Sequence, residues 1–282
     1  MNSIYICASK KNQKEHGSFL EDLRSKYILK DINDCKVESD SIIIVLGGDG
    51  SLNYLLNNID KLDNQRVIYF PLGTANDFAR SLKLDPIKPS LAIVDEVVRD
   101  APIIDVPVMS CNEKYFINVV TGGALALVTE SGSDILKQLT GKLSYYVGAL
   151  EEIVSPESYS LTFKLSNSKE ESITTNGFIV SQGLYAGGGV KVSPHFTPSF
   201  KKTFNFLTLE SENLTSSLGS IVKMQQSDVV CDLSDSEMIS EDIVSLTIKS
   251  ESEIPIKLDG EEYSSKVLKF SKSENKLKFY QY

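Results

Sequence analysis

Several residue types are scarce in this chain of 282 residues, and their scarcity limits the classes of protein to which it can belong. It has no tryptophan, two histidines and four cysteines, and the cysteines form no CxxC pair. That spacing indicates neither a disulfide scaffold nor a zinc site. Basic residues are also few: 29 Lys and Arg stand against 38 Asp and Glu, with a net charge of −9 and a pI of about 4.9. Nucleic acid is not expected as a partner, because phosphate backbones are bound by dense fields of Lys and Arg.

Long apolar runs are missing as well. No stretch approaches the roughly 20 apolar residues that cross a bilayer, and the N-terminus lacks the basic stretch and apolar core of a secretion signal. The scattered cysteines fit a reducing compartment. We therefore expect a cytoplasmic protein whose contact with membranes is transient and peripheral.

The first hundred residues alternate short apolar runs with segments of helical spacing. Residues 4–8, 41–46 and 66–70 are rich in branched apolar side chains and predict buried strands. Helices are expected near 19–27, from about 52, and at 76–82 and 91–99. This alternation is typical of a parallel sheet that is covered on both faces.

From residue 103 onward the pattern changes to strand-like segments, which predicts a second, mostly β domain. The segments are 115–120, 161–165, 177–181, 203–209 and 243–248. One long amphipathic helix is expected within this domain, over 134–154.

A glycine-rich run follows the predicted strand 41–46 and precedes a predicted helix. Its glycines let the backbone approach a phosphate and turn N–H groups toward it, and the helix N-terminus adds favourable partial charge. It is neither a Walker loop nor a dinucleotide fingerprint, since no Gly-Lys-Ser/Thr follows and Asn stands in place of the last glycine. A tight structural turn is the alternative. The run consists of Gly47, Gly48, Asp49, Gly50, Ser51, Leu52 and Asn53.

A second run, PLGTANDFAR at 71–80, repeats the order of strand, glycine turn and helix start. Thr74 is placed to donate a hydroxyl and to cap the helix, whereas Asn76 and Asp77 could hold either the loops or a ligand. Two such turns at one edge of a parallel sheet can face a single crevice.

An acidic pair lies far down the chain, at Asp259 and Glu261 around Gly260. Carboxylates two residues apart on an extended chain project to the same side, so we expect the pair to face one ligand. An ordinary hairpin turn is the alternative, since turns attract these residue types.

Together GGDGSLN and PLGTANDFAR resemble the signature of the diacylglycerol kinase catalytic-domain family, especially its YegS-type bacterial lipid kinases. Further matches follow in order along nearly the whole chain: 116–118, 121–123, 139–145, 186–189, 193–194 and 257–261. The resemblance implies the NAD kinase/diacylglycerol kinase-like fold, with an N-terminal Rossmann-like parallel-sheet domain and a C-terminal β-sandwich domain. The domains are expected at 1–105 and 106–271, with the tail 272–282 packing back on the first.

The resemblance also implies an ATP-dependent lipid kinase that transfers a phosphoryl group to a lipid hydroxyl at the membrane surface. ATP is expected on the 47–53 run, Thr74 and Asn76, with Mg²⁺ on its phosphates and Asp49 as a contributor to the metal. Glu261 is expected to accept the proton of the lipid hydroxyl, with Asp259 as an alternative base or metal partner. The lipid, diacylglycerol, phosphatidylglycerol or another, and the oligomeric state stay open.

Three departures from the family pattern are visible in the sequence. The stretch 195–203 carries Lys201 and Lys202 and no carboxylate, so an accessory metal site of the C-terminal domain is expected to be absent. Tyr54 stands where Glu is common, and the N-terminal segment is short. These departures keep open a nucleotide- or lipid-binding protein with little turnover. NAD kinase, which shares the GGDG loop, is a further alternative that the 71–80 run disfavours.

Overall fold

In a computed structural model, residues 3–126, 158–165, 169–193, 200, 204–210 and 238–282 are described. They form two compact units, Met1–Val108 with Ser273–Tyr282, and Met109–Lys272. The predicted helix over 134–154 lies outside the described residues, as do Lys201 and Lys202.

The first unit is built on a parallel sheet with the strand order β15-β4-β3-β1-β2. Its central strands β1 and β3 are almost wholly buried, as expected where helices cover both faces. The strands are β1 (Ser3–Ala8), β2 (Ile28–Asp31), β3 (Ile42–Gly47), β4 (Arg66–Pro71) and the end of β15 (Glu261–Tyr280).

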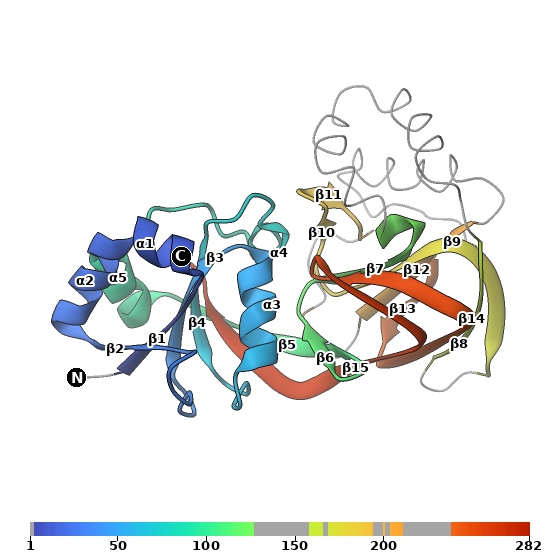
Figure 1. Cartoon of the computed structure of the whole chain (residues 1–282), viewed down its shortest axis with the longest axis horizontal. Helices are drawn as coiled ribbons and strands as arrows, with labels where there is room; N and C mark the ends of the chain where they lie inside the picture. The colour runs from blue at the N-terminus through green and yellow to red at the C-terminus, as the bar shows by residue number, and fades with distance from the viewer. Residues whose placement is uncertain (1–2, 127–157, 166–168, 194–199, 201–203, 211–237) are drawn as a thin grey trace, which may run out of the picture. The chain divides into compact units, whose positions relative to one another are not determined.

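Helices cover the two faces of this sheet (Figure 1). On one face, buried side chains of α2 (Gly17–Lys26) and α5 (Leu91–Asp100) pack on alternate residues of the strands, among them Ile44 and Phe70. The other face carries α3 (Asp49–Asn58), whose Leu52, Leu55 and Leu56 are buried. Two short helices, α1 (Lys10–Glu15) and α4 (Asp77–Leu82), complete the unit. The period of two in the strands and of nearly four in the helices thus produces three layers.

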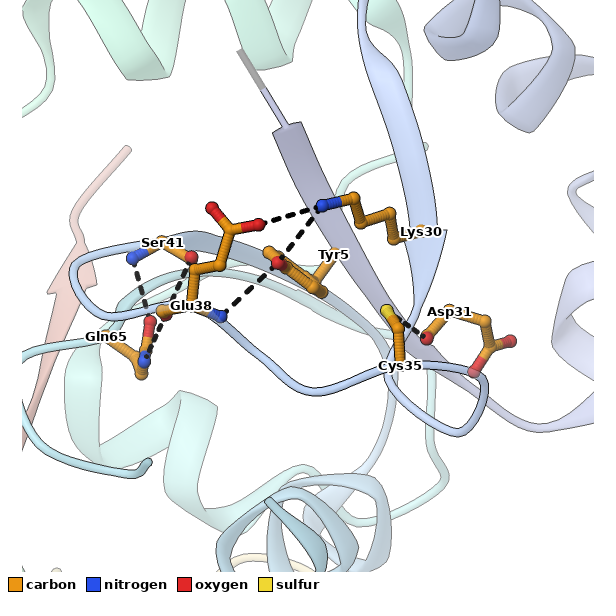
Figure 2. A network of polar contacts seen from close by, with 7 residues as sticks. All are labelled: Tyr5, Lys30, Asp31, Cys35, Glu38, Ser41 and Gln65. Atoms are coloured by element: carbon orange, nitrogen blue, oxygen red, sulfur yellow. Dashed lines mark hydrogen bonds and ion pairs between the residues drawn. The ribbon is translucent and has the colours of Figure 1, made fainter. Parts of the chain in front are cut away.

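A hydrogen-bond network holds the connection between β2 and β3, which crosses the unit without a helix (Figure 2). The Tyr5 hydroxyl on β1 accepts a bond from the Glu38 backbone N–H at 3.3 Å and lies 3.5 Å from the Lys30 ammonium. The Gln65 side chain donates to the Glu38 carbonyl at 2.9 Å and accepts from the Ser41 N–H at 2.9 Å. Since Tyr5 and Gln65 are fully buried, these bonds fix the crossing segment to the core.

The second unit is an antiparallel arrangement around a core of large apolar side chains that includes Phe178, Phe206 and Phe270. Two of its strands, β9 and β14, each pair with both β7 and β8 at different points along their length. The strands are the end of β5 (Ile103–Cys111), β6 (Lys114–Phe116), β7 (Val119–Gly123), β8 (Tyr159–Leu165), β9 (Glu171–Ser181), β10 (Tyr185–Ala186), β11 (Val190–Lys191), β12 (Phe204–Glu210), β13 (Met238–Ile243), β14 (Ser245–Leu258) and the start of β15.

Two strands predicted as continuous are interrupted. The segment 115–120 divides into β6 and β7, because the backbone N–H groups of Ile117 and Asn118 bond to a side chain, Asp259, and not to a strand. The segment 243–248 divides at Val244, between β13 and β14.

The last strand, β15, joins the two units covalently. Its first half pairs antiparallel with β14, from Glu261 to Ser271. Its end pairs in parallel with β4, where Lys278 faces Arg66. Phe279 is fully buried beside Phe78, with ring centroids 5.2 Å apart. The C-terminal residues are therefore part of the first unit's core.

Candidate functional site

The two glycine turns lie in backbone contact at the carboxyl edge of the first sheet. Gly47 at the end of β3 is in register with Pro71 at the end of β4, and the Leu72 N–H donates to the Gly47 carbonyl at 2.9 Å. A Cβ atom placed on Gly73 would lie 2.6 Å from the Cα of Gly48. No side chain fits at this position, so the two loops can contact each other only if Gly73 is a glycine.

The first turn leads directly into helix α3. Gly48 is the N-cap of this helix and supplies no side-chain cap, while Gly50 in the first turn is exposed. The N–H groups of Ser51 and Leu52 bond back to the Gly48 carbonyl. An exposed helix N-terminus of this kind favours an anion such as a phosphate.

Asp49 bridges the two turns. Its carboxylate accepts bonds from the backbone N–H groups of Asp77 at 2.8 Å and Phe78 at 3.0 Å, and so caps the N-terminus of α4 from another loop. Burial raises the pKa of Asp49, and these N–H groups oppose that rise. The expectation that Thr74 caps α4 was wrong, because Asp49 performs this function. Its contribution to a metal site stays a prediction.

Asn76 holds the second turn in shape. Its side-chain amide donates to the carbonyls of Pro71 at 3.0 Å and Gly73 at 2.7 Å, and its Oδ1 accepts from the Gly73 N–H at 3.0 Å. The sequence left open whether Asn76 holds the loops or a ligand, and these bonds show that it holds its own loop. Thr74 is exposed at the tip of this turn and is available to a ligand.

Asn12 and Cys7 also reach this edge of the sheet, and sequence reasoning missed both. The Asn12 side chain donates to the Leu46 carbonyl at 2.8 Å, next to the first turn. The Cys7 thiol donates to the Ser51 carbonyl at 3.4 Å, and burial raises the pKa of that thiol to about 12. The sequence feature that could have placed Asn12 here is Ser9, a helix N-cap residue directly after β1. Its hydroxyl caps α1 by accepting a bond from the Asn12 N–H at 3.2 Å.

Tyr54 projects from α3 into solvent. It is 44% exposed, and its hydroxyl bonds to Asn33. The residue that departs from the family pattern is thus attached to the neighbouring loop 32–41.

The acidic pair lies in the second unit, where Asp259 and Gly260 form the turn between β14 and β15. Both have positive φ, 48° and 95°, and the flanking Leu258 and Glu261 are paired across the hairpin. The argument that an extended chain directs both carboxylates to one side was therefore wrong, and the hairpin alternative is correct. Asp-Gly suits such a turn because both central residues need positive φ.

The two carboxylates have different surroundings. Glu261 is exposed at the start of β15. Asp259 is 7% exposed, and its carboxylate accepts three backbone N–H bonds, from Ile117 at 2.7 Å and from Asn118 and Val119 at 2.9 Å each. A group bonded in this way holds backbone in place.

A metal site made by protein alone is not found among the described residues, where no three His, Cys, Asp or Glu side chains gather. In the same part of the chain, no helix has the length and apolar character needed to cross a bilayer.

Solved structures with this arrangement define the class of fold. A diacylglycerol kinase from Bacillus anthracis strain Sterne aligns with a TM-score of 0.66 at 15% identity, over 99% of this chain and 97% of that one. An NAD kinase from Archaeoglobus fulgidus, solved in complex with ATP, aligns with a TM-score of 0.55 at 14% identity, over 100% and 94%. At these identities the likeness establishes the fold, which is that of diacylglycerol and NAD kinases.

Sequence comparison finds similarity to one of these two kinases, diacylglycerol kinase. Residues 12–106 match the model of the diacylglycerol kinase catalytic domain. A diacylglycerol kinase of Bacillus subtilis strain 168 is 31% identical over 61% of this chain and 56% of its own length. One from Staphylococcus haemolyticus is 29% identical over 78% and 64%. The resemblance inferred from the sequence is confirmed, and the chain matches 56% and 64% of the length of these two relatives.

Proposed function

We propose that this chain is an ATP-dependent lipid kinase, which transfers the γ-phosphoryl group to a lipid hydroxyl such as that of diacylglycerol or phosphatidylglycerol. One observation carries the proposal: Gly48 and Gly73 bring two strand-to-helix turns into backbone contact, inside the segment that matches the kinase domain. The names of the relatives, diacylglycerol kinases, support the lipid acceptor.

The turns provide the kind of surface that a triphosphate needs. Backbone N–H groups at the start of α3 and the exposed Thr74 hydroxyl are donors, and Asp49 and Asn76 hold the two turns in shape. The relative of this fold that was solved with ATP supports the choice of nucleotide. We assign phosphate binding to the run Gly47–Asn53 and Thr74, and loop support to Asn76.

Mg²⁺ would neutralise charge on the phosphate oxygens when bound. This ion commonly keeps several waters and takes only one or two carboxylates besides phosphate oxygens, so a single carboxylate beside the phosphates would suffice. Asp49 is the carboxylate within the proposed phosphate loop Gly47–Asn53. It would serve the metal with lone pairs beyond those given to Asp77 and Phe78.

Glu261 is assigned as the group that receives the proton of the lipid hydroxyl. Its exposure leaves it open to an acceptor molecule. Since the transition state of phosphoryl transfer is loose, the carboxylate mainly orients the hydroxyl and takes its proton late.

The experiment is incubation of the purified chain with γ-labelled ATP and a total membrane lipid extract. Labelled lipid is expected from the unmodified chain and from Glu262→Gln, the neighbouring exposed carboxylate. Glu261→Gln should bind nucleotide and yield no labelled lipid. Label on added NAD in place of lipid would identify an NAD kinase. ATP binding without any labelled product would indicate a binding protein.

A further inference from the structure

A buried polar cluster lies beneath the Asp-Gly-Glu turn of the second unit. Its centre is the segment 117–119, where the chain passes from β6 to β7. Ile117 and Asn118 are 1% and 2% exposed, so their backbone groups need partners within the protein.

The turn supplies partners from one side. The Asp259 carboxylate accepts the N–H groups of all three residues of this segment, and the Asp259 N–H donates to the Val119 carbonyl at 2.9 Å. Asp259 thus contacts Val119 through both its side chain and its backbone.

The segment 182–185 supplies partners from the other side. The Asn118 carbonyl accepts the N–H groups of Gln182 and Gly183 at 3.1 Å each, and the Gln182 side chain donates to the Ile117 carbonyl at 2.6 Å. The Asn118 side chain donates to the Tyr185 carbonyl at 2.9 Å. The segment 117–119 is therefore bonded to the turn on one side and to the segment 182–185 on the other.

We propose that Asp259 is a positioning residue, which anchors the turn so that Glu261 is presented in one orientation, and is not a second base. This inference rests on the proposed function, in which Glu261 receives the proton. Glu261 lies one residue beyond Gly260, which has a φ of 95° and no atom within 4 Å of where a Cβ would stand. No neighbour fixes the turn from the Cβ side of Gly260, so the bonds of Asp259, together with the Leu258–Glu261 pair of the hairpin, hold this turn.

Amide hydrogen exchange tests the anchor without reference to activity. Asp259→Asn keeps the shape of the side chain but replaces one acceptor oxygen by an NH2 group. This group can only donate, so it cannot bond to the backbone N–H groups of residues 117–119. Exchange at Ile117, Asn118 and Val119 should accelerate by about ten-fold or more, because hydrogen bonds to a charged group are lost. Glu261→Gln should leave these amides at their original rate. Unchanged exchange in Asp259→Asn would overturn the anchor.

Kinetics test the consequence for catalysis. Per site that binds nucleotide, Asp259→Asn should lower kcat by about a hundred-fold, the scale of a displacement near 1 Å, with the KM for ATP unchanged. Because kcat is expressed per nucleotide-binding site, any unfolded fraction of the variant does not lower the measured kcat. A kcat within two-fold of the unmodified chain would refute positioning. A variant Glu261→Gln that keeps its activity while Asp259→Asn has none would make Asp259 the base.

Gly260→Ala provides a second perturbation should Asp259→Asn fail to fold. It retains both carboxylates and meets no neighbouring atom, but strains the backbone at positive φ. A lower kcat with an unchanged KM for ATP is expected, and full activity would count against the proposal. Gly17→Ala is the matched control, since Gly17 is also free of neighbours and has no positive φ. An unmodified chain that phosphorylates no lipid would refute the proposed function, while the exchange experiment would still decide on the anchor.

Discussion

Replacement of Gly73 by alanine tests the contact between the two phosphate-loop candidates. The new Cβ would lie 2.6 Å from the Gly48 Cα, 3.1 Å from the Gly48 nitrogen and 2.8 Å from Asn76 Oδ1. Two of these atoms belong to the backbone, so a change of rotamer cannot relieve the overlap.

The magnitude follows from ordinary carbon contact distances. Non-bonded carbons prefer separations of about 3.5–4.0 Å, so the turns must separate by roughly 1 Å. Overpacking of this size costs about 1–3 kcal/mol, which is smaller than the roughly 5–15 kcal/mol that stabilises a typical domain. The variant should therefore fold. Loss of one charged hydrogen bond to phosphate, about 1.5–3 kcal/mol, would weaken ATP binding by about ten- to a hundred-fold.

Isothermal titration with Mg-ATP and a thermal melt measure the two effects separately. We expect weaker ATP binding and a lower Tm for Gly73→Ala, with Gly17→Ala resembling the unmodified chain in both. An unchanged Tm would show that the turns are not in contact. A lower Tm with unchanged affinity would confirm the contact and refute its role in nucleotide binding.

Three further predictions concern stability and reactivity. Asp49→Asn should cost about 0.5–2 kcal/mol in urea unfolding, because α4 loses part of its cap. Burial raises the pKa of Asp49 in the folded protein. Protonation of Asp49 therefore stabilises the fold fully at pH values below its pKa in the unfolded chain, and this stabilisation is lost as the pH rises through its pKa in the folded protein. The Asp49→Asn variant should lack this pH-dependent part of the stability. Phe279→Ala, at a fully buried site, should cost about 3–5 kcal/mol, and a loss below 1 kcal/mol would contradict the packing of the C-terminus. In mass-spectrometric alkylation at pH 8, exposed Cys35 should react before Cys7 and Cys111, whose pKa burial raises to about 12; equal rates would refute that burial.

Much of the first unit could be predicted because its strands and turns are local features. Apolar runs followed by a glycine-containing turn located β3 and β4, and the helical spacing near Phe19 located α2. The partner of Asp49 could not be predicted, since a carboxylate beside glycines suits a metal and a helix cap equally well. Only the fold places it 2.8 Å from the Asp77 nitrogen.

The acidic pair was misread for a different reason. Asp-Gly between two strand-like runs is itself a hairpin signal, and on these residues alone it favoured the turn; the family resemblance favoured a catalytic pair. The three N–H donors to Asp259 come from residues about 140 positions earlier, so no local sequence pattern predicts these hydrogen bonds. Long separation also hid the length of β15, because its two halves pair with different strands.

The course of β15 has a consequence for how the protein is made. A ribosome releases residues 1–108 long before it reaches Phe279, yet that side chain fills part of the first unit's interior. During synthesis, β4 has an unpaired edge until residues 273–282 emerge, and unpaired edges invite association with other chains. A nascent chain that lacks residues 273–282 is thus the form of this protein most exposed to aggregation, and the first unit is completed only after these residues have been made.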